Sequence, residues 1–308
     1  MIALVLSGAA NFGAMQAGAL EAILRTGMRP GMMIGTSAGA LNAIALAADP
    51  TVDGAIDLQD KWSALVPEKI GVPRTFTALR HLVTRKDGLL SNEPLARHLV
   101  EVLPSYETYG ELLAASGVHA YAVSVEMRTA ALRVFGDNPE DRLHDGAMAS
   151  TAVPPYLPPW QIGEDRYLDG GVYAKLPICA AFERGAAQVV AIDVTHSMGS
   201  WKAAHGVMGV SGYALSLLVE AQTAYEIAWS RQAGLPLRVF HLKAPEHIPF
   251  WDYSCGAELV RIGRELAERE LEREPLRLEP EWRSALLRRF RTIPRSPICQ
   301  QGRLRPGA

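Results

Sequence analysis

The chain has 308 residues, of which 48% are hydrophobic and 21% are charged, and its formal net charge is −2. This size and apolar content suit one large or two modest domains with a substantial core. The near-neutral charge excludes a general nucleic-acid binder, which needs a basic surface. Cys179, Cys255 and Cys299 are too few and too scattered for a disulfide framework or a metal knuckle, so we expect no metal and no other cofactor.

The first elements predict a strand, a helix, a second strand and a second helix. An uninterrupted apolar run from Ile2 to Leu6 is typical of a strand that is buried on both faces of a sheet. Apolar residues at helical spacing then predict a helix over 13–26. A short strand at 32–34 and a helix over 38–48 follow. Two consecutive strand–turn–helix units indicate an α/β fold.

The rest of the chain mixes helices and strands. We expect a β-hairpin with strands at 120–125 and 131–135, and further strands at 188–194 and 237–242. The expected helices lie over 57–65, 93–103, 213–231 and 258–273. Prolines interrupt the chain past Glu274, with one short helix expected over 282–291. We therefore expect a main domain over 1–274 and an arginine-rich, partly helical extension over 275–308.

Three uncharged stretches, at 1–20, 30–48 and 203–219, are interrupted by polar residues or glycines. None of them predicts a membrane-spanning helix, and no basic segment precedes the first, as a secretory signal would require. We expect a cytoplasmic protein. Seven arginines crowd the C-terminal end: Arg283, Arg288, Arg289, Arg291, Arg295, Arg303 and Arg305. They predict either a solvated surface or peripheral contact with anionic lipid headgroups at a membrane.

The segment Gly35-Thr36-Ser37-Ala38-Gly39 joins the second expected strand to its helix. The Gly-x-Ser-x-Gly pattern is typical of a nucleophile elbow, a sharp turn that lifts a serine hydroxyl above the edge of a sheet. The glycines permit the tight backbone, and free N–H groups at the helix start favour a negative charge formed there. A glycine–serine turn without a catalytic role is the alternative interpretation.

The loop from Gly8 to Gly13 follows the first expected strand. A phosphate-binding P-loop needs a lysine directly after Gly13, where Ala14 stands, and a dinucleotide fingerprint needs a glycine in place of Ala10. The remaining interpretation is an oxyanion hole, in which backbone N–H groups face the negative oxygen of a tetrahedral intermediate. Its expected donors are the N–H groups of Gly8, Ala9, Ala10 and Ala38.

A serine nucleophile needs a base, and the sequence offers two kinds. Among the eight histidines, His196 at the end of an expected strand is the best placed for a Ser-His-Asp triad. Asp169, in Asp169-Gly170-Gly171, follows the proline-dense segment Ala149 to Pro159, which is rigid enough to hold an aspartate against a serine. An aspartate before two glycines is also a common turn, so both interpretations stay open.

Taken in order, four motifs resemble the patatin-like phospholipase family: the loop from Gly8 to Gly13, the elbow around Ser37, the segment from Ala149 to Pro159, and Asp169-Gly170-Gly171. The resemblance implies a three-layer α/β/α fold with a mainly parallel central sheet. It also implies a lipid acyl-ester hydrolase of the phospholipase A or lysophospholipase kind, with Ser37 as nucleophile and Asp169 as its base. In that dyad no histidine takes part.

One motif departs from the family pattern. The family typically shows Gly-Gly-Gly-x-Arg-Gly in its first loop, whereas this chain has Ala9, Ala10 and Phe12 in place of Gly, Gly and Arg. A left-handed backbone at either alanine costs on the order of 1–2 kcal/mol. Backbone N–H groups survive either change, so the hole can still form. The alternative is a non-catalytic lipid-binding or regulatory protein on the same scaffold.

Overall fold

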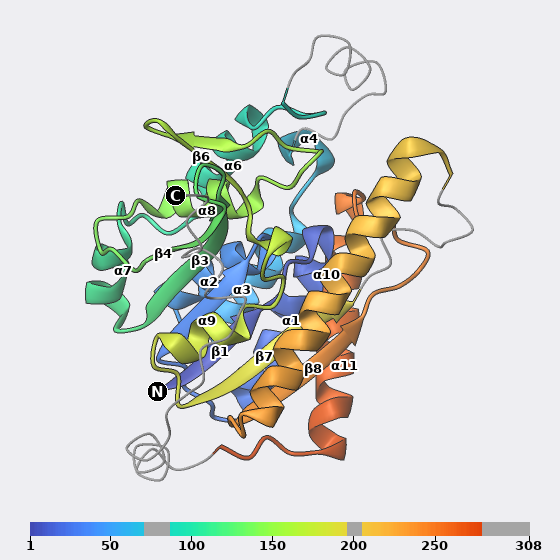
Figure 1. The fold of residues 1–308 in the computed structure, drawn as a ribbon. Helices are drawn as coiled ribbons and strands as arrows, with labels where there is room; N and C mark the ends of the chain where they lie inside the picture. Colours follow the sequence, from blue (N-terminus) through green and yellow to red (C-terminus); the bar gives the residue numbers. More distant parts are fainter. Residues whose placement is uncertain (71–86, 196–204, 279–308) are drawn as a thin grey trace.

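The computed structural model describes residues 1–70, 87–195 and 205–278, and within these residues eight strands form one mixed sheet (Figure 1). The strand order is β5-β6-β3-β2-β1-β7-β8, and β4 pairs with β3. The parallel strands are β1 (Ile2–Leu6), β2 (Met32–Thr36), β3 (His119–Glu126), β7 (Gln188–Thr195) and β8 (Leu237–Lys243). The antiparallel additions are β4 (Ala131–Phe135), β5 (Trp160–Ile162) and β6 (Asp165–Asp169).

Helices cover both faces of this sheet, which confirms the expected three-layer α/β/α architecture (Figure 1). One side carries α1 (Gly13–Arg25), α2 (Ala38–Ala48), α3 (Val52–Ser63) and α11 (Gly256–Arg273), and the other carries α9 (Ile178–Glu183) and α10 (Gly206–Gln232). Strand β1 shows why both faces are covered. Leu4 and Leu6 join the core on the first side, and Ala3 and Val5 join the core on the second. A strand with two buried faces therefore reads as uninterrupted apolar sequence.

The sequence predicted the parallel strands, the hairpin and the long helices, but some boundaries differ. Two helices begin earlier than expected. Helix α3 starts at Val52 instead of residue 57, and α10 starts at Gly206 instead of residue 213. The unpredicted elements are β5, β6, α9, α4 (Pro67–Ile70), α7 (Tyr109–Ser116) and α8 (Leu143–Thr151), whereas α6 (Glu93–Val102) was expected. The helix expected over 282–291 and the seven C-terminal arginines lie outside the described residues. Among the described helices, none combines the length and the apolar content that crossing a bilayer requires.

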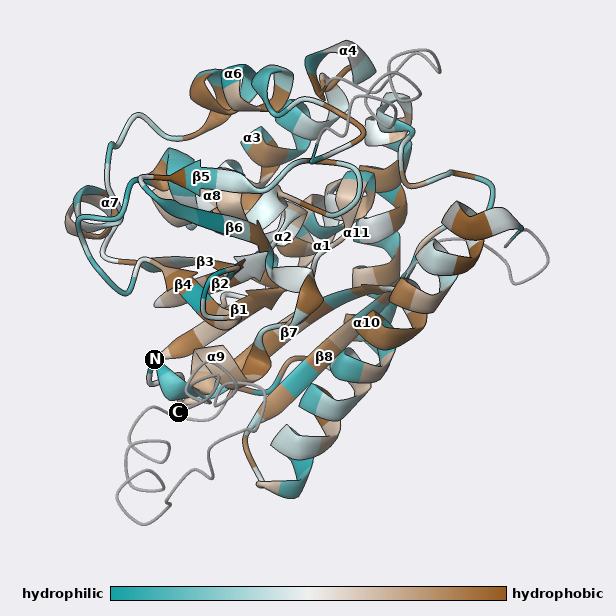
Figure 2. Ribbon diagram, turned by 45° about the horizontal axis from the view of Figure 1, so that its top comes forward, coloured by the Kyte–Doolittle hydropathy of each residue, from teal (hydrophilic) through white to brown (hydrophobic). Residues whose placement is uncertain are grey.

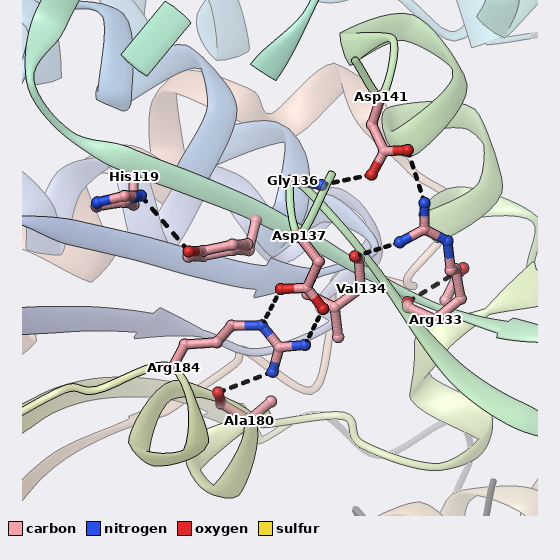
Figure 3. A network of polar contacts seen from close by, with 10 residues as sticks. His119, Arg133, Val134, Gly136, Asp137, Asp141, Ala180 and Arg184 are labelled. Atoms are coloured by element: carbon pink, nitrogen blue, oxygen red, sulfur yellow. Dashed lines mark hydrogen bonds and ion pairs between the residues drawn. The ribbon is translucent and has the colours of Figure 1, made fainter. Parts of the chain in front are cut away.

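Charged groups fix the hairpin β3–β4 to its surroundings (Figure 3). Arg133 donates to one carboxylate oxygen of Asp141 at 2.6 Å, and the N–H of Gly136 donates to the other at 2.9 Å. Arg184, directly after α9, donates to Asp137 at 2.7 Å. Hydrogen bonds between charged partners are stronger than neutral ones. They fix the turn that leads from β4 to α8 (Figure 3).

The register of β3 brings two distant segments together. Thr36, the last residue of β2, lies opposite Val123, and Asp169, the last residue of β6, lies opposite Ser124. Because β4 occupies the other edge of β3, β6 continues along the same edge at the point where β2 ends. The residue that follows β2, Ser37, and the end of β6 therefore meet at one place on the sheet.

Candidate active site

Ser37 lies at the sharp turn between β2 and α2, where the elbow motif predicts it. Its backbone has φ 55° and ψ −127°, a conformation that is strained for any residue other than glycine. The flanking glycines are required by close contacts. A Cβ atom at Gly35 would lie 2.2 Å from the carbonyl oxygen of Gly39, and one at Gly39 would lie 2.5 Å from that of Leu6. The local sequence therefore folds into a turn that only these small residues permit.

Asp169 and Ser37 line the same cavity, and the Ser37 hydroxyl interacts with the Asp169 carboxylate. The backbone N–H of Gly171 donates to Asp169 Oδ1 at 2.7 Å. The N–H of Asp169 donates in turn to the carbonyl of Ala152 at 3.0 Å. Ala152 belongs to the proline-dense segment, so this segment positions the aspartate through its backbone.

Burial raises the pKa of Asp169 from 3.8 to about 6, although the interaction with the Ser37 hydroxyl and the hydrogen bond from the Gly171 N–H lower it. The residue is 4% exposed, so its charged form loses the stabilisation that water provides. A carboxylate whose pKa approaches neutrality is better matched to accept a proton from a hydroxyl group. The surroundings of Asp169 thus make it a stronger base than an exposed aspartate.

Within the described residues, no histidine donates to or accepts from the side chain of Ser37 or Asp169. His196, the candidate for a Ser-His-Asp triad, lies outside the described residues. His98 on α6 lines the same cavity as Ser37, and its Nδ1 lies 3.8 Å from a carboxylate oxygen of Glu101. Burial lowers the pKa of His98, which favours its neutral form.

Ser150 is a part of the site to which the sequence analysis gave no role. Its Oγ accepts the backbone N–H of Ser37 at 2.9 Å and donates to the carbonyl of Val123 at 2.7 Å. The side chain is fully buried. It therefore joins the elbow to β3. The signal in the sequence was the pair of hydroxyl residues, Ser150 and Thr151, at the end of α8, but their partners could not be known.

The expected oxyanion donors fall into two groups. The N–H of Gly8 donates to the carbonyl of Lys175 at 2.9 Å, so the prediction of Gly8 as a free donor is corrected. In the described part of the chain, the N–H groups of Ala9, Ala10 and Ala38 make no backbone hydrogen bond, and all three residues line the cavity beside Ser37. These three groups are the available donors to an oxyanion.

The first loop is held without the arginine of the family pattern. Phe12, which stands in its place, is 2% exposed and belongs to the main core. The Asn11 side chain donates to the carbonyl of Pro249 at 3.0 Å and to that of Asp252 at 2.7 Å. Ala10 adopts φ 47°, so the left-handed backbone considered for this loop does occur at one of the two alanines.

A buried ion pair lies beside the loop and was not predicted from the sequence. The Lys175 ammonium donates to Asp193 Oδ1 at 2.9 Å and to the carbonyl of Val194 at 2.8 Å, and each side chain of the pair is only 6% exposed. Burial alone would raise the pKa of Asp193. The interactions with His241 and Lys175 outweigh burial and lower this pKa to about 2. Lys175 also lines the cavity, so this ion pair lies next to the site.

A cavity of about 240 Å³ opens beside Ser37 and Asp169. Apolar side chains from α2, α3, α6 and α10 form much of its wall, among them Leu41, Trp62, Leu99, Val102, Leu215 and Val219. A concave apolar site with a few polar groups at one end suits a ligand that has a long apolar part. In the described residues, no group of three or more histidine, cysteine or acidic side chains is arranged to hold a metal ion.

Comparison with known proteins gives one family match and two structural neighbours. The profile of the family described as "Patatin-like phospholipase" matches residues 4–182. VipD from Legionella pneumophila is similar, with a TM-score of 0.46 and 13% identity over 88% of this chain and 66% of that chain. The type III effector protein ExoU has a TM-score of 0.40 and 14% identity over 89% of this chain and 53% of its own. The chain thus spans less than two thirds of either neighbour. The search of curated proteins found no match to this sequence.

Proposed function

Because the chain belongs to the patatin-like phospholipase family, a family of lipid acyl hydrolases, we propose that it hydrolyses lipid acyl esters with Ser37 as nucleophile and Asp169 as base. The observation that carries this proposal is that the Ser37 hydroxyl and the buried Asp169 carboxylate line one cavity and interact there. The apolar cavity beside the pair supports an acyl chain as the bound part of the substrate.

The proposed reaction has two halves. The Ser37 oxygen attacks the ester carbonyl carbon while Asp169 accepts the hydroxyl proton, and the carbonyl oxygen becomes negative. The N–H groups of Ala9, Ala10 and Ala38 donate to that oxygen. When the tetrahedral intermediate collapses, the ester bond breaks and the leaving alcohol takes the proton from Asp169. The acyl group stays on Ser37.

Water completes the cycle. Asp169 accepts a proton from a water molecule, whose oxygen attacks the acyl-enzyme carbonyl. The second intermediate collapses, the bond to Ser37 breaks, and the proton returns to the serine oxygen. The products are a carboxylic acid and the free enzyme. We place this activity in the domain over 1–274 of a cytoplasmic enzyme, with 275–308 as an extension that contacts membranes peripherally.

Labelling with a fluorophosphonate probe tests the nucleophile. We expect the wild type to be labelled and the Ser37→Ala variant to lose both labelling and ester hydrolysis. Ser216→Ala is a matched control, because Ser216 also lines the cavity but has no role in the proposed chemistry. Asp169→Asn should lower kcat by roughly 10²–10⁴-fold, the usual contribution of a general base. Equal labelling of wild type and Ser37→Ala would exclude Ser37 as the nucleophile.

A second candidate function is non-catalytic lipid binding on the same scaffold. The observations that favour it are the paired N–H of Gly8 and the left-handed backbone at Ala10 in the loop that should bind the oxyanion. A panel of short-chain esters, lysophospholipids and phospholipids separates the two functions. Retained lipid binding without turnover of any substrate supports the second, whereas turnover that disappears in Asp169→Asn supports the first.

A further inference from the structure

The side chain of Asn11 joins the first loop to a turn that begins 238 residues later in the chain. Residues 249–252 form this turn, which is closed by a hydrogen bond from the N–H of Asp252 to the carbonyl of Pro249 at 3.0 Å. The Asn11 amide donates to the carbonyls at both ends of the turn, to Pro249 at 3.0 Å and to Asp252 at 2.7 Å. An asparagine amide has two N–H donors, so both are used here. Because Asn11 is 1% exposed, its side chain is shielded from water.

Asn11 directly follows Ala9 and Ala10, two residues whose N–H groups are available to an oxyanion. Ala10 has φ 47°, a left-handed backbone that a residue other than glycine keeps only where its surroundings hold it. Alanine side chains form no hydrogen bond, and Asn11 has the only polar side chain in the sequence from Gly8 to Gly13. The Asn11 amide is therefore a side-chain anchor next to the strained residue.

The turn that accepts these bonds belongs to the wall of the cavity. Phe250 in the turn and Tyr253 directly after it line the cavity. Phe250 also packs edge-on against Tyr156, another lining residue, with 5.4 Å between the ring centroids. Contacts other than those with Asn11 thus hold the turn, so it can support the loop.

Two closely packed helices fix the loop and the turn relative to each other. The loop leads into α1, the turn is followed by α11, and these helices lie side by side (Figure 2). A Cβ atom at Gly18 on α1 would lie 2.0 Å from the carbonyl oxygen of Val260 on α11. One at Gly263 on α11 would lie 2.0 Å from that of Met15 on α1. Because no side chain separates the helices at these points, the bonds of Asn11 join two segments whose spacing is set.

We propose that Asn11 is a positioning residue for ester hydrolysis. Its amide holds the first loop on the turn at 249–252 and so keeps the N–H groups of Ala9 and Ala10 directed toward the oxyanion. This inference rests on the proposed function. In the part of the chain that the structure describes, Asn11 does not line the cavity, so it acts through the loop and does not touch the substrate. Backbone donors stabilise a transition state only when they are held in place before the reaction, and a displacement of about 1 Å can cost on the order of 10²-fold in rate.

Kinetics of two Asn11 variants test this role. Asn11→Leu keeps the branched shape of the side chain but removes both donors, and Asn11→Ala is measured beside it in case the leucine prevents folding. On a soluble p-nitrophenyl ester, we expect kcat/KM to fall roughly 10- to 100-fold in both. Gln59→Leu is the matched control. Gln59 is a buried amide that joins α3 to Glu21 on α1 at 2.8 Å and does not line the cavity. This control should lose stability but keep the wild-type kcat/KM.

Two further measurements separate positioning from a general loss of structure. An alkyl trifluoromethyl ketone forms an oxyanion when a serine adds to it, whereas an alkyl ether of the same length does not. In the Asn11 variants, the inhibition constant of the ketone should rise in parallel with the loss of kcat/KM, and the affinity for the ether should stay within about twofold. The midpoint of the pH profile of kcat/KM should stay at its wild-type value. A general loosening would admit water to Asp169 and lower this midpoint.

The outcomes distinguish this inference from the proposed function. A wild type that hydrolyses no ester and is not inhibited by the ketone would overturn the proposed function and this inference with it. If the wild type is active, a wild-type kcat/KM in a folded Asn11 variant would overturn the inference alone. Equal weakening of ketone and ether, or a lowered midpoint of the pH profile, would do the same.

Discussion

The Ser150 hydroxyl holds the backbone N–H of Ser37 at 2.9 Å, so the main chain of the proposed nucleophile is fixed by a residue from a different part of the chain. The same hydroxyl donates to Val123 on β3. Because the N–H of Ser37 is occupied in this way, the donors to an oxyanion have to come from neighbouring residues. The N–H of Ser37 therefore shapes the elbow, and the N–H groups of other residues would bind the transition state.

Replacing Ser150 with alanine should reduce both stability and activity. The change leaves the N–H of Ser37 and the carbonyl of Val123 unpaired in a buried place, so the free energy of unfolding should fall by about 1–3 kcal/mol. We expect kcat to fall roughly tenfold or more because the elbow is displaced. Urea unfolding and hydrolysis of a soluble ester measure the two effects. Ser63→Ala is the control, since the Ser63 hydroxyl bonds only within its own helix at 2.8 Å. Wild-type kcat in Ser150→Ala would contradict this role.

The pKa of Asp169 predicts the pH dependence of activity. Only the carboxylate form accepts the Ser37 proton, and burial raises the pKa of this group to about 6. We therefore expect kcat/KM to rise with pH through about 6 and to level off near neutrality. The pH profile of kcat/KM on a soluble ester measures this. A constant value between about pH 5 and pH 7 would show that Asp169 is not the base.

The raised pKa of Asp169 also predicts how stability depends on pH. The free energy of unfolding should fall with rising pH, whereas activity should rise. In the unfolded chain the pKa of Asp169 lies at its ordinary 3.8, and folding raises it to about 6, so the folded state binds the proton more tightly. Its stabilising contribution is complete below about pH 4 and is lost as the pH rises through 6, a change of about 3 kcal/mol. Asp169→Asn stays neutral and should be more stable than the wild type at about pH 8, but not at about pH 4. Urea unfolding at the two pH values decides this, and an identical difference at both would contradict it.

Substitutions at the two loop alanines test the strain in the first loop. Ala10 has φ 47°, so Ala10→Gly should raise the free energy of unfolding by up to about 1 kcal/mol. Ala9 has φ −149° and gains no relief, so Ala9→Gly should lower it by about 0.5–1 kcal/mol through the greater freedom of the unfolded chain. Thermal unfolding of the pair measures the contrast. An equal loss in both variants would show that Ala10 is not strained.

The ion pair between Lys175 and Asp193 should behave as one unit. Lys175→Met leaves a buried carboxylate without its ammonium partner, and we expect a loss of about 3–5 kcal/mol in the free energy of unfolding. The double variant Lys175→Met/Asp193→Asn should lose less than the two single variants together, because no unpaired charge remains. Urea unfolding of the four proteins completes the cycle. Strictly additive losses would mean that the two side chains are not coupled.

Much of the fold could be predicted because its central strands carry a strong local pattern. Ile2–Leu6 is apolar without interruption since both of its faces are buried, and the elbow follows from the glycines around Ser37. Strand β6 could not be predicted in this way, because Asp165–Asp169 is short and begins and ends with a charged residue. The first turns of α10 were missed because Gly206, Gly209 and Gly212 have low helix propensity.

The residues of the site also differ in whether a local sequence pattern predicts them. The elbow residues share one local segment, so their spacing alone pointed to a nucleophile. Asp169 was assigned through the family resemblance, and its position in the same cavity as Ser37 is visible only in the structure. The bond from Ser150 to Ser37 and the pair formed by Lys175 and Asp193 join residues that are distant in sequence. Contacts of this kind leave no periodic pattern, which is why the sequence analysis did not find them.

Strand β3 sets the relative position of Ser37 and Asp169, because Thr36 and Asp169 lie opposite its consecutive residues Val123 and Ser124. Lengthening a surface connection elsewhere would leave the gap between hydroxyl and carboxylate unchanged. Deleting one residue inside β3 would instead turn its following side chains to the opposite face and pull the two partners out of alignment. Circularly permuted versions of this protein should therefore keep Ser37 and Asp169 together wherever the new ends leave β3 and its two neighbours whole.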